Sequence, residues 1–146
     1  MAFFTEFFHS YKLHMDQNPL DGSWHHLAIV WELLDRKCQM YLDGVFITEF
    51  TRPDWSNQSI SGDLFIGQNL HQMKGGGTTD SFKGRMTSFN MWNYKFSKVE
   101  IASLVQNCRS RLGNIFQWYK IIARENLRGE VKLLQPSSCM YDCLGL

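Results

Sequence analysis

Residues Leu64 to Met86, LFIGQNLHQMKGGGTTDSFKGRM, form a polar, glycine-rich segment between two short apolar runs. A β-sandwich can hold a calcium ion in such a loop, because backbone carbonyls and small polar side chains supply oxygen ligands. Calcium takes about six to eight oxygens and binds more tightly as carboxylates are added. The loop contains one acidic residue, Asp80. The loop residues alone leave three interpretations open: a metal site, the remnant of one, or a simple connection.

The other acidic residues do not form a catalytic pattern. Hydrolysis of glycosides on a β-sandwich requires two or three carboxylates that alternate on one strand. Glu32, Glu49 and Glu100 are isolated from other acids, and the aspartates lie in predicted turns, where aspartate is favoured for bonds to its own backbone. These aspartates are Asp35, Asp54 and Asp63. No G-x-S-x-G, H-E-x-x-H or phosphate-binding motif occurs, so the sequence predicts that the protein is not an enzyme.

The four cysteines, Cys38, Cys108, Cys139 and Cys143, do not have the spacing of a paired C-x2-C zinc site. Their even number is compatible with disulfides. It is equally compatible with reduced thiols, with Cys38 filling a strand face. Asn57 begins an N-x-S sequon, which is a glycosylation acceptor only in a secreted protein.

Histidines suggest a second kind of metal site. His71 together with His25 or His26 could bind a transition metal. A histidine in a polar loop or at the end of a strand is more often simply solvated, and we take the solvated interpretation.

The chain has 146 residues, 44% of them hydrophobic, which is enough for one domain with a core. The net charge is +1 without runs of like charge, a pattern that disfavours nucleic-acid or anionic membrane partners. No apolar stretch approaches the roughly 18 to 20 residues of a membrane-spanning helix. The opening MAFFTEFF lacks the features of a signal peptide, so we expect an extracellular form of the chain to lack its beginning.

Alternation of apolar and polar side chains predicts β-strands through the first two-thirds of the chain. Their spacing of roughly ten residues is typical of an antiparallel sandwich rather than of βαβ units. The predicted strands are YKLHM (11–15), WHHLAIVWEL (24–33), KCQMYL (37–42), VFITEF (45–50), GDLFIGQ (62–68) and GRMTSFNMWNY (84–94).

The faces and turns of these strands are also predicted. Alternate residues from Leu27 to Trp31 are apolar and share one face, as do alternate residues from Cys38 to Leu42. Asp43-Gly44 between two alternating runs predicts a tight hairpin turn.

One segment has helical spacing instead. Its apolar residues include Val99, Ile101 and Leu104, and Ser97 with Glu100 forms a capping box. We predict one helix from about Lys98 to Asn107. The fold class is therefore mainly β, a β-sandwich with one late α-helix.

Seven segments resemble the pentraxin domain in their order and spacing. They are DGSWHHLAIVWE, YLDG, LFIGQ, FKGRMTSFNMWN, FSKVEI, LGNIFQW and RGEV. The resemblance extends from about Trp24 to Gln135 and implies a concanavalin-A-like jelly-roll β-sandwich of the pentraxin and laminin-G type, with its N-terminal strands missing. Residues 1–136 would form the partial domain, and residues 137–146 a C-terminal tail.

The chain departs from the pentraxin pattern at two signature positions. Ala28 stands where the family has a cysteine, and Val30 where it has a hydroxyl side chain. The disulfide shared by the family is therefore absent. A sandwich without its early strands exposes strand edges and apolar surface. We expect residues 3–8, FFTEFF, to cover part of that surface, or the chain to associate.

The resemblance also implies a disulfide near the C-terminus. Cys108 lies just before LGN, where long pentraxins carry a cysteine that pairs with one near the chain end. Either Cys139 or Cys143 would be its partner.

The resemblance implies only a degraded calcium site. The positions that match the calcium ligands of the family are Asn69, the Leu70 carbonyl and Asp80, while the distal glutamate of the family falls in the triple glycine, residues 75–77. One carboxylate with neutral oxygens predicts a weak remnant site. No other cofactor is expected.

The function implied by the resemblance is a non-catalytic extracellular binding or adhesion module of pentraxin type. It would be a fragment of a larger secreted glycoprotein or of the ectodomain of an adhesion receptor at the cell surface. Its partner would be a protein or a glycan, and the chain could form oligomers. The alternatives are a laminin-G-like adhesion domain that binds glycan or protein, and a truncated form without function.

Overall fold

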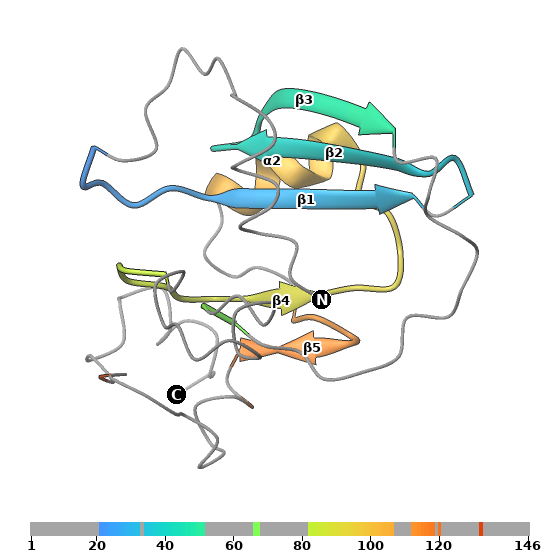
Figure 1. The fold of residues 1–146 in the computed structure, drawn as a ribbon. Helices are drawn as coiled ribbons and strands as arrows, with labels where there is room; N and C mark the ends of the chain where they lie inside the picture. The colour runs from blue at the N-terminus through green and yellow to red at the C-terminus, as the bar shows by residue number, and fades with distance from the viewer. Residues whose placement is uncertain are drawn as a thin grey trace, which may run out of the picture. The chain divides into compact units, whose positions relative to one another are not determined.

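The computed structural model describes residues 21–32, 34–51, 66–67, 82–106, 112–118, 120 and 132. The chain divides into two compact units, one formed by residues 1–21 with 58–85 and the other by residues 22–57 with 86–146. Every labelled element in Figure 1 belongs to the second unit. These elements are β1 (Leu27–Glu32), β2 (Lys37–Leu42), β3 (Val45–Thr51), β4 (Asn90–Met91), α2 (Lys98–Gln106) and β5 (Phe116–Gln117).

Strands β1, β2 and β3 form an antiparallel sheet in sequence order. Trp31 pairs with Cys38 and Leu27 pairs with Leu42, so the two predicted apolar rows lie on the same face of the sheet. This confirms the predicted alternation. Cys38 and Leu42 are buried, whereas Leu27 is 37% exposed.

The turn between β2 and β3 is the predicted Asp43-Gly44 hairpin. Both residues have positive φ, +50° and +80°, as a type I′ turn requires. Glycine is needed at the second position for packing as well, because a Cβ on Gly44 would lie 3.1 Å from the Cα of Ala102 in α2. The turn and the helix therefore pack backbone against backbone.

A β-bulge interrupts the pairing of β2 with β3. Met40 pairs with Thr48 and Tyr41 pairs with Phe46, which leaves Ile47 as the extra residue. Beyond the bulge, the rings of Tyr41 and Phe46 meet edge to face with centroids 5.5 Å apart. This aromatic contact fixes the register of the hairpin next to its turn.

The face of the sheet opposite to Cys38 and Leu42 packs against α2 and the segment before it (Figure 1). Val30 and Tyr41 from the sheet form a buried cluster with Phe96 and Ile101. The ring of Trp92 contacts that of Phe96 edge to face at 4.9 Å. This cluster joins the sheet to the C-terminal half of the second unit, and its members are far apart in sequence.

Helix α2 begins where the capping box predicted. The backbone N–H of Ser97 donates to Glu100 Oε2 at 2.8 Å, and the N–H of Glu100 donates to Ser97 Oγ at 3.3 Å. The observed helix, Lys98–Gln106, confirms the prediction of Lys98 to about Asn107.

The predicted strand over residues 84–94 is much shorter in the structure. Its extended part is β4, which pairs with β5. Ser88, just before β4, has a φ of +57°, which is incompatible with a continuous strand. The predicted strand 11–15 and most of 62–68 lie outside the described residues. Within the described residues, the chain is mainly β with one short helix.

Candidate functional site

The polar loop identified from the sequence is closed at its base. The N–H of Phe82 donates to the carbonyl of Gly67 at 2.8 Å, so the chain enters and leaves the loop at adjacent points. Gly67 has a φ of +84°, which favours glycine. The Phe82 ring lies over Gly84, where a Cβ would come within 2.8 Å of the ring. The backbone hydrogen bond thus joins the two ends of the loop, and the ring contact orders the segment that leaves it.

The loop residues themselves lie outside the described part of the chain. The weak calcium site therefore stays a prediction, as do the disulfide and the glycosylation site. The residues concerned are Asn57, Asn69, Leu70, Asp80, Cys108, Cys139 and Cys143.

Cys38 is a free thiol that is only 2% exposed. Burial raises the pKa of this thiol to about 11, so it stays protonated near neutral pH. A protonated thiol is a poor nucleophile and a poor metal ligand. Cys38 therefore fills a strand face, as one interpretation of the sequence held.

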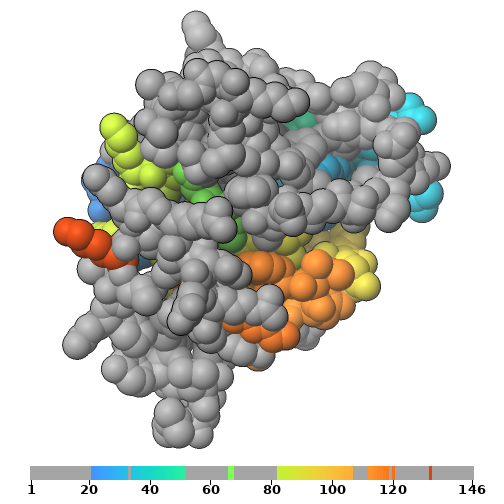
Figure 2. Space-filling model, turned by 60° about the horizontal axis from the view of Figure 1, so that its bottom comes forward, coloured from blue at the N-terminus to red at the C-terminus, as the bar shows by residue number. Residues whose placement is uncertain are grey.

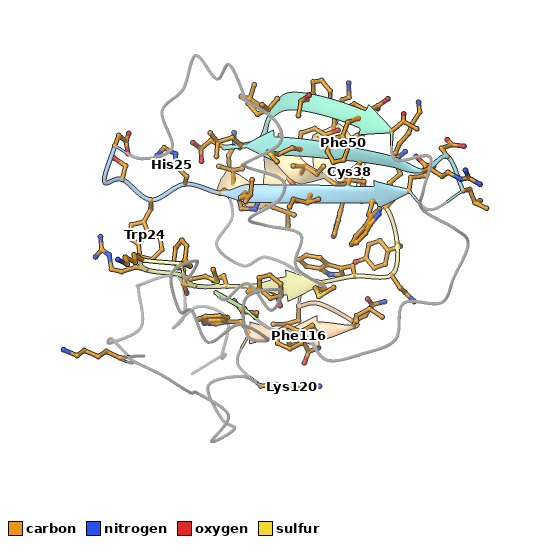
Figure 3. The ribbon with its side chains drawn as sticks, viewed as in Figure 1. Trp24, His25, Cys38, Phe50, Phe116 and Lys120 are labelled. Carbon is orange, nitrogen blue, oxygen red and sulfur yellow. The ribbon has the colours of Figure 1, made fainter. Side chains whose placement is uncertain are left out.

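A polar cluster lies at the entrance to β1, and we call it the Asp43 clasp. It consists of His25, His26 and Asp43. The carboxylate of Asp43 contacts His25 Nδ1 at 2.7 Å and accepts the backbone N–H of His26 at 2.8 Å. The N–H of Asp43 in turn donates to the carbonyl of His26 at 2.8 Å. Figure 3 shows His25 beside the start of β1.

The clasp perturbs the ionisation of its members. Burial raises the pKa of Asp43, but the hydrogen bonds from His25 and His26 outweigh burial, and the pKa lies below its ordinary value. Burial lowers the pKa of His26, and the charge of Asp43 offsets only part of this effect.

The sequence had suggested that both histidines were simply solvated, and this was wrong. His25 is bound to Asp43, and the ring of His26 is partly buried. The register of β1 with β2 would have indicated that these histidines lie near Asp43. Because Leu27 pairs with Leu42, the preceding residue lies opposite Asp43.

The strand carboxylates each have a structural partner. Glu32 contacts Lys95 Nζ at 2.6 Å. Glu49 accepts from Gln39 Nε2 at 2.6 Å and contacts Lys37 Nζ at 3.2 Å. In the described ranges, no group of three or more histidine, cysteine or acidic side chains could hold a metal ion.

Side-chain amides join β4 to the segment that leads into β5. The Asn114 amide donates to Asn93 Oδ1 at 2.6 Å and accepts the Asn93 backbone N–H at 3.1 Å. The N–H of Gly113 donates to Asn90 Oδ1 at 3.2 Å. Residues 112–118, orange in Figure 2, reach the surface, and Ile115 is 60% exposed. No sequence pattern predicts this amide cluster, because the two segments are far apart in the chain.

A family match covers most of the chain. Residues 5–102 match the family described as the Concanavalin A-like lectin/glucanases superfamily, and the chain belongs to this superfamily.

Within the superfamily, the chain is a pentraxin-like domain. It is 28% identical to the rat (Rattus norvegicus) protein "Sushi, von Willebrand factor type A, EGF and pentraxin domain-containing protein 1" over 86% of this chain and 4% of that protein. It is 31% identical to neuronal pentraxin-2 of Mus musculus over 67% of this chain and 23% of that protein. Neuronal pentraxin-1 of Homo sapiens is 27% identical over the same shares. The chain thus spans less than a quarter of the length of each of these relatives.

A solved structure, an S-layer domain-containing protein from Clostridium thermocellum, is similar over 61% of this chain and 42% of that chain. Its TM-score is 0.40 at 16% identity, which is too low for an argument about the fold. No helix among the described residues is long and apolar enough to cross a membrane.

Proposed function

We propose that the chain is a non-catalytic extracellular binding or adhesion module of pentraxin type, part of a larger secreted protein or receptor ectodomain. The observation that carries this proposal is the pentraxin likeness, which covers 86% of this chain but only a small part of a long multidomain relative. A short match of this kind is typical of a module that is used within larger proteins. The module would be a jelly-roll β-sandwich over residues 1–136, with the tail at 137–146.

The positions of the acids support the absence of catalysis. The superfamily name includes glucanases, and glycoside hydrolysis requires two carboxylates about 5 to 9.5 Å apart across the substrate. The carboxylates on the described strands instead form ion pairs with lysines, Glu32 with Lys95 and Glu49 with Lys37. Glu100 is used to cap a helix. Acids with such roles stabilise a scaffold.

We further propose that recognition does not depend on calcium. Asn69, the Leu70 carbonyl and Asp80 would offer a single carboxylate. The base of the loop is closed by the hydrogen bond of the Phe82 N–H to the Gly67 carbonyl, a contact that needs no ion.

A laminin-G-like adhesion domain remains the alternative. The name of the matching family, Laminin_G_3, favours it. The two candidates differ in their partner, since the alternative gives more weight to glycans.

Thermal unfolding of the full chain in calcium and in EDTA, together with its monomer fraction, tests the proposal. A ligand that binds only the folded state must raise the midpoint. We expect one cooperative transition at the same temperature in both buffers. A rise with calcium would overturn the proposed calcium independence, and the lack of any transition would favour a truncated form without function.

Two assays address the partner and catalysis. Binding of the labelled chain to cultured cells, before and after enzymatic removal of surface glycans, separates a protein partner from a glycan. We expect binding that survives the treatment, whereas its loss would favour the laminin-G-like alternative. Incubation with a soluble β-glucan should release no reducing sugar, and any release above that of the heat-denatured chain would contradict the non-catalytic assignment.

A further inference from the structure

The Asp43-Gly44 turn is held from two sides. On one side, the Asp43 clasp ties it to the segment before β1 through contacts of 2.7 and 2.8 Å. On the other side, Gly44 lies so close to α2 that an added Cβ would be 3.1 Å from Ala102 Cα and 3.2 Å from Val105 Cγ2. The entrance to β1, the hairpin turn and the helix therefore meet at this point.

The ring of His26 has a polar atom that nothing satisfies. Its Nδ1 is buried and has no hydrogen-bond partner. A neutral imidazole with its proton on Nε2 leaves only a lone pair at this atom. A protonated ring carries N–H groups on both nitrogens, so the cation would bury a charged donor without an acceptor. The site accepts the neutral ring and disfavours the cation.

The neighbouring titratable groups do not supply an acceptor for a proton on His26 Nδ1. Among the described residues, the turn contributes Asp43, whose carboxylate is engaged by His25 and by the backbone N–H of His26. From α2, the residues nearest to the turn are Ala102 and Val105, which do not titrate. His25 differs from His26, because its Nδ1 can donate to Asp43 in both the neutral and the protonated ring.

We propose that the Asp43 clasp is an acid-released latch, in which protonation of His26 reversibly frees the segment before β1 from the Asp43-Gly44 turn. The opened segment would expose the His26 ring to water, where both of its N–H groups find acceptors. This function goes beyond partner binding. It would give the module a surface whose conformation differs between neutral and mildly acidic surroundings.

The direction of the pH effect follows from the linkage between protonation and opening. Burial lowers the pKa of His26, so the closed latch binds the proton less well than the open one. The latch is therefore fully stable above the ordinary histidine pKa of about 6.5 and weakens as the pH falls toward the lower value of the closed state. For a single proton, the opening constant rises in this window by at most about tenfold per pH unit. Asp43 titrates separately, because its pKa is lowered from an ordinary value of 3.8.

Amide hydrogen exchange of the full chain, followed by NMR between pH 7.5 and pH 5, tests the proposal. After correction for intrinsic exchange rates, we expect protection of the Asp43 amide to be constant above about pH 6.5 and to fall below it, by at most about tenfold per pH unit. It should be lower than the protection of Met40 at every pH, because the latch opens without global unfolding. A flat profile would overturn the proposal, and so would protection equal to that of Met40 throughout.

Two matched variants identify the titrating group. His26→Phe keeps a ring but cannot be protonated, so the slope at Asp43 should vanish, whereas His25→Phe should retain it. An unchanged slope in His26→Phe, or its loss only in His25→Phe, would overturn the assignment. If His26→Phe does not fold, NMR titration of the wild-type ring decides. Midpoints that coincide for the His26 ring and the Asp43 amide support the latch, and different midpoints overturn it.

Discussion

At the scale of single residues, two neighbours in one turn have separate tasks. Asp43 binds the segment before β1 through its carboxylate, and Gly44 allows α2 to approach through its lack of a side chain. Both adopt positive φ, which asparagine, aspartate and glycine tolerate best. The common Asp-Gly hairpin signal is therefore used here for more than turning the chain.

Replacing Gly44 by alanine should separate backbone strain from packing. Gly44→Ala places a Cβ 3.1 Å from Ala102 Cα at a φ of +80°. Positive φ costs about 1 to 2 kcal/mol for an alanine, and overpacking adds about 1 to 3 kcal/mol. The control is Gly22→Ala, at a φ of +86° with no atom within 4 Å. Urea unfolding should show a clearly larger loss for Gly44→Ala, and equal losses would mean that the helix simply moves away.

At the scale of elements, α2 is held by its first turn and by one buried side chain. The capping box satisfies amides that have no partner within the helix, and Ile101 is 1% exposed. The outer side of the helix has little contact, with Val99 79% exposed. A helix of this length is marginal in isolation, so it depends on its cap, on the burial of Ile101 and on its packing against the Gly44 turn.

The cap can be tested by removing the Ser97 hydroxyl. Ser97→Ala deletes the acceptor of the Glu100 N–H and should cost about 1 kcal/mol in the free energy of unfolding. Ser103→Ala is the control, because this exposed hydroxyl donates to the carbonyl of Glu100 within the helix. Alanine there should be neutral or slightly stabilising. Comparable losses in the two variants, measured by chemical denaturation, would argue against the cap.

The packing side of the helix gives a second contrast. Ile101→Ala removes a side chain from the cluster with Val30, Tyr41 and Phe96, and we expect a loss of about 2 to 5 kcal/mol. Val99→Ala truncates an exposed side chain on the same helix and should change stability by less than about 0.5 kcal/mol. A small effect of Ile101→Ala on the thermal midpoint would show that α2 is peripheral to the fold.

At the scale of the whole molecule, β2 is the most buried of the described strands. It has a strand on each edge, its Tyr41 faces α2, and its Cys38, Met40 and Leu42 are buried on the opposite face. Strands that are buried on both faces belong to the inner part of layered folds. We expect β2 to be the last strand to lose protection when the molecule opens.

Cys38 can report on this opening. Because its thiol is buried and its pKa is raised to about 11, iodoacetamide should modify it at least about a hundredfold more slowly in the native chain than in denaturant. Quantification of the Cys38 peptide by mass spectrometry separates it from the other cysteines. Similar rates in the two conditions would mean that β2 is accessible without unfolding.

Much of the described fold could be predicted because its determinants are local. Strand alternation, the Asp43-Gly44 turn and the Ser97–Glu100 box each depend on residues a few positions apart, and the structure confirms them. The interruption of the strand predicted over residues 84–94 could not be predicted in this way. It occurs at Ser88, and serine is not a typical residue for positive φ.

Contacts between distant residues were decided by the tertiary structure alone. Lys95 reaches Glu32, Asn90 accepts from Gly113, and the Asp43 carboxylate meets two histidines that the sequence had suggested were solvated. Whether such groups meet depends on the register of the strands and on the packing of α2, and no short window of sequence contains both. The sequence by itself therefore determined β1 to β3, the turn between β2 and β3, helix α2 and the pentraxin resemblance. Only the folded chain decided which polar groups became neighbours, because it alone brings distant segments within hydrogen-bonding distance.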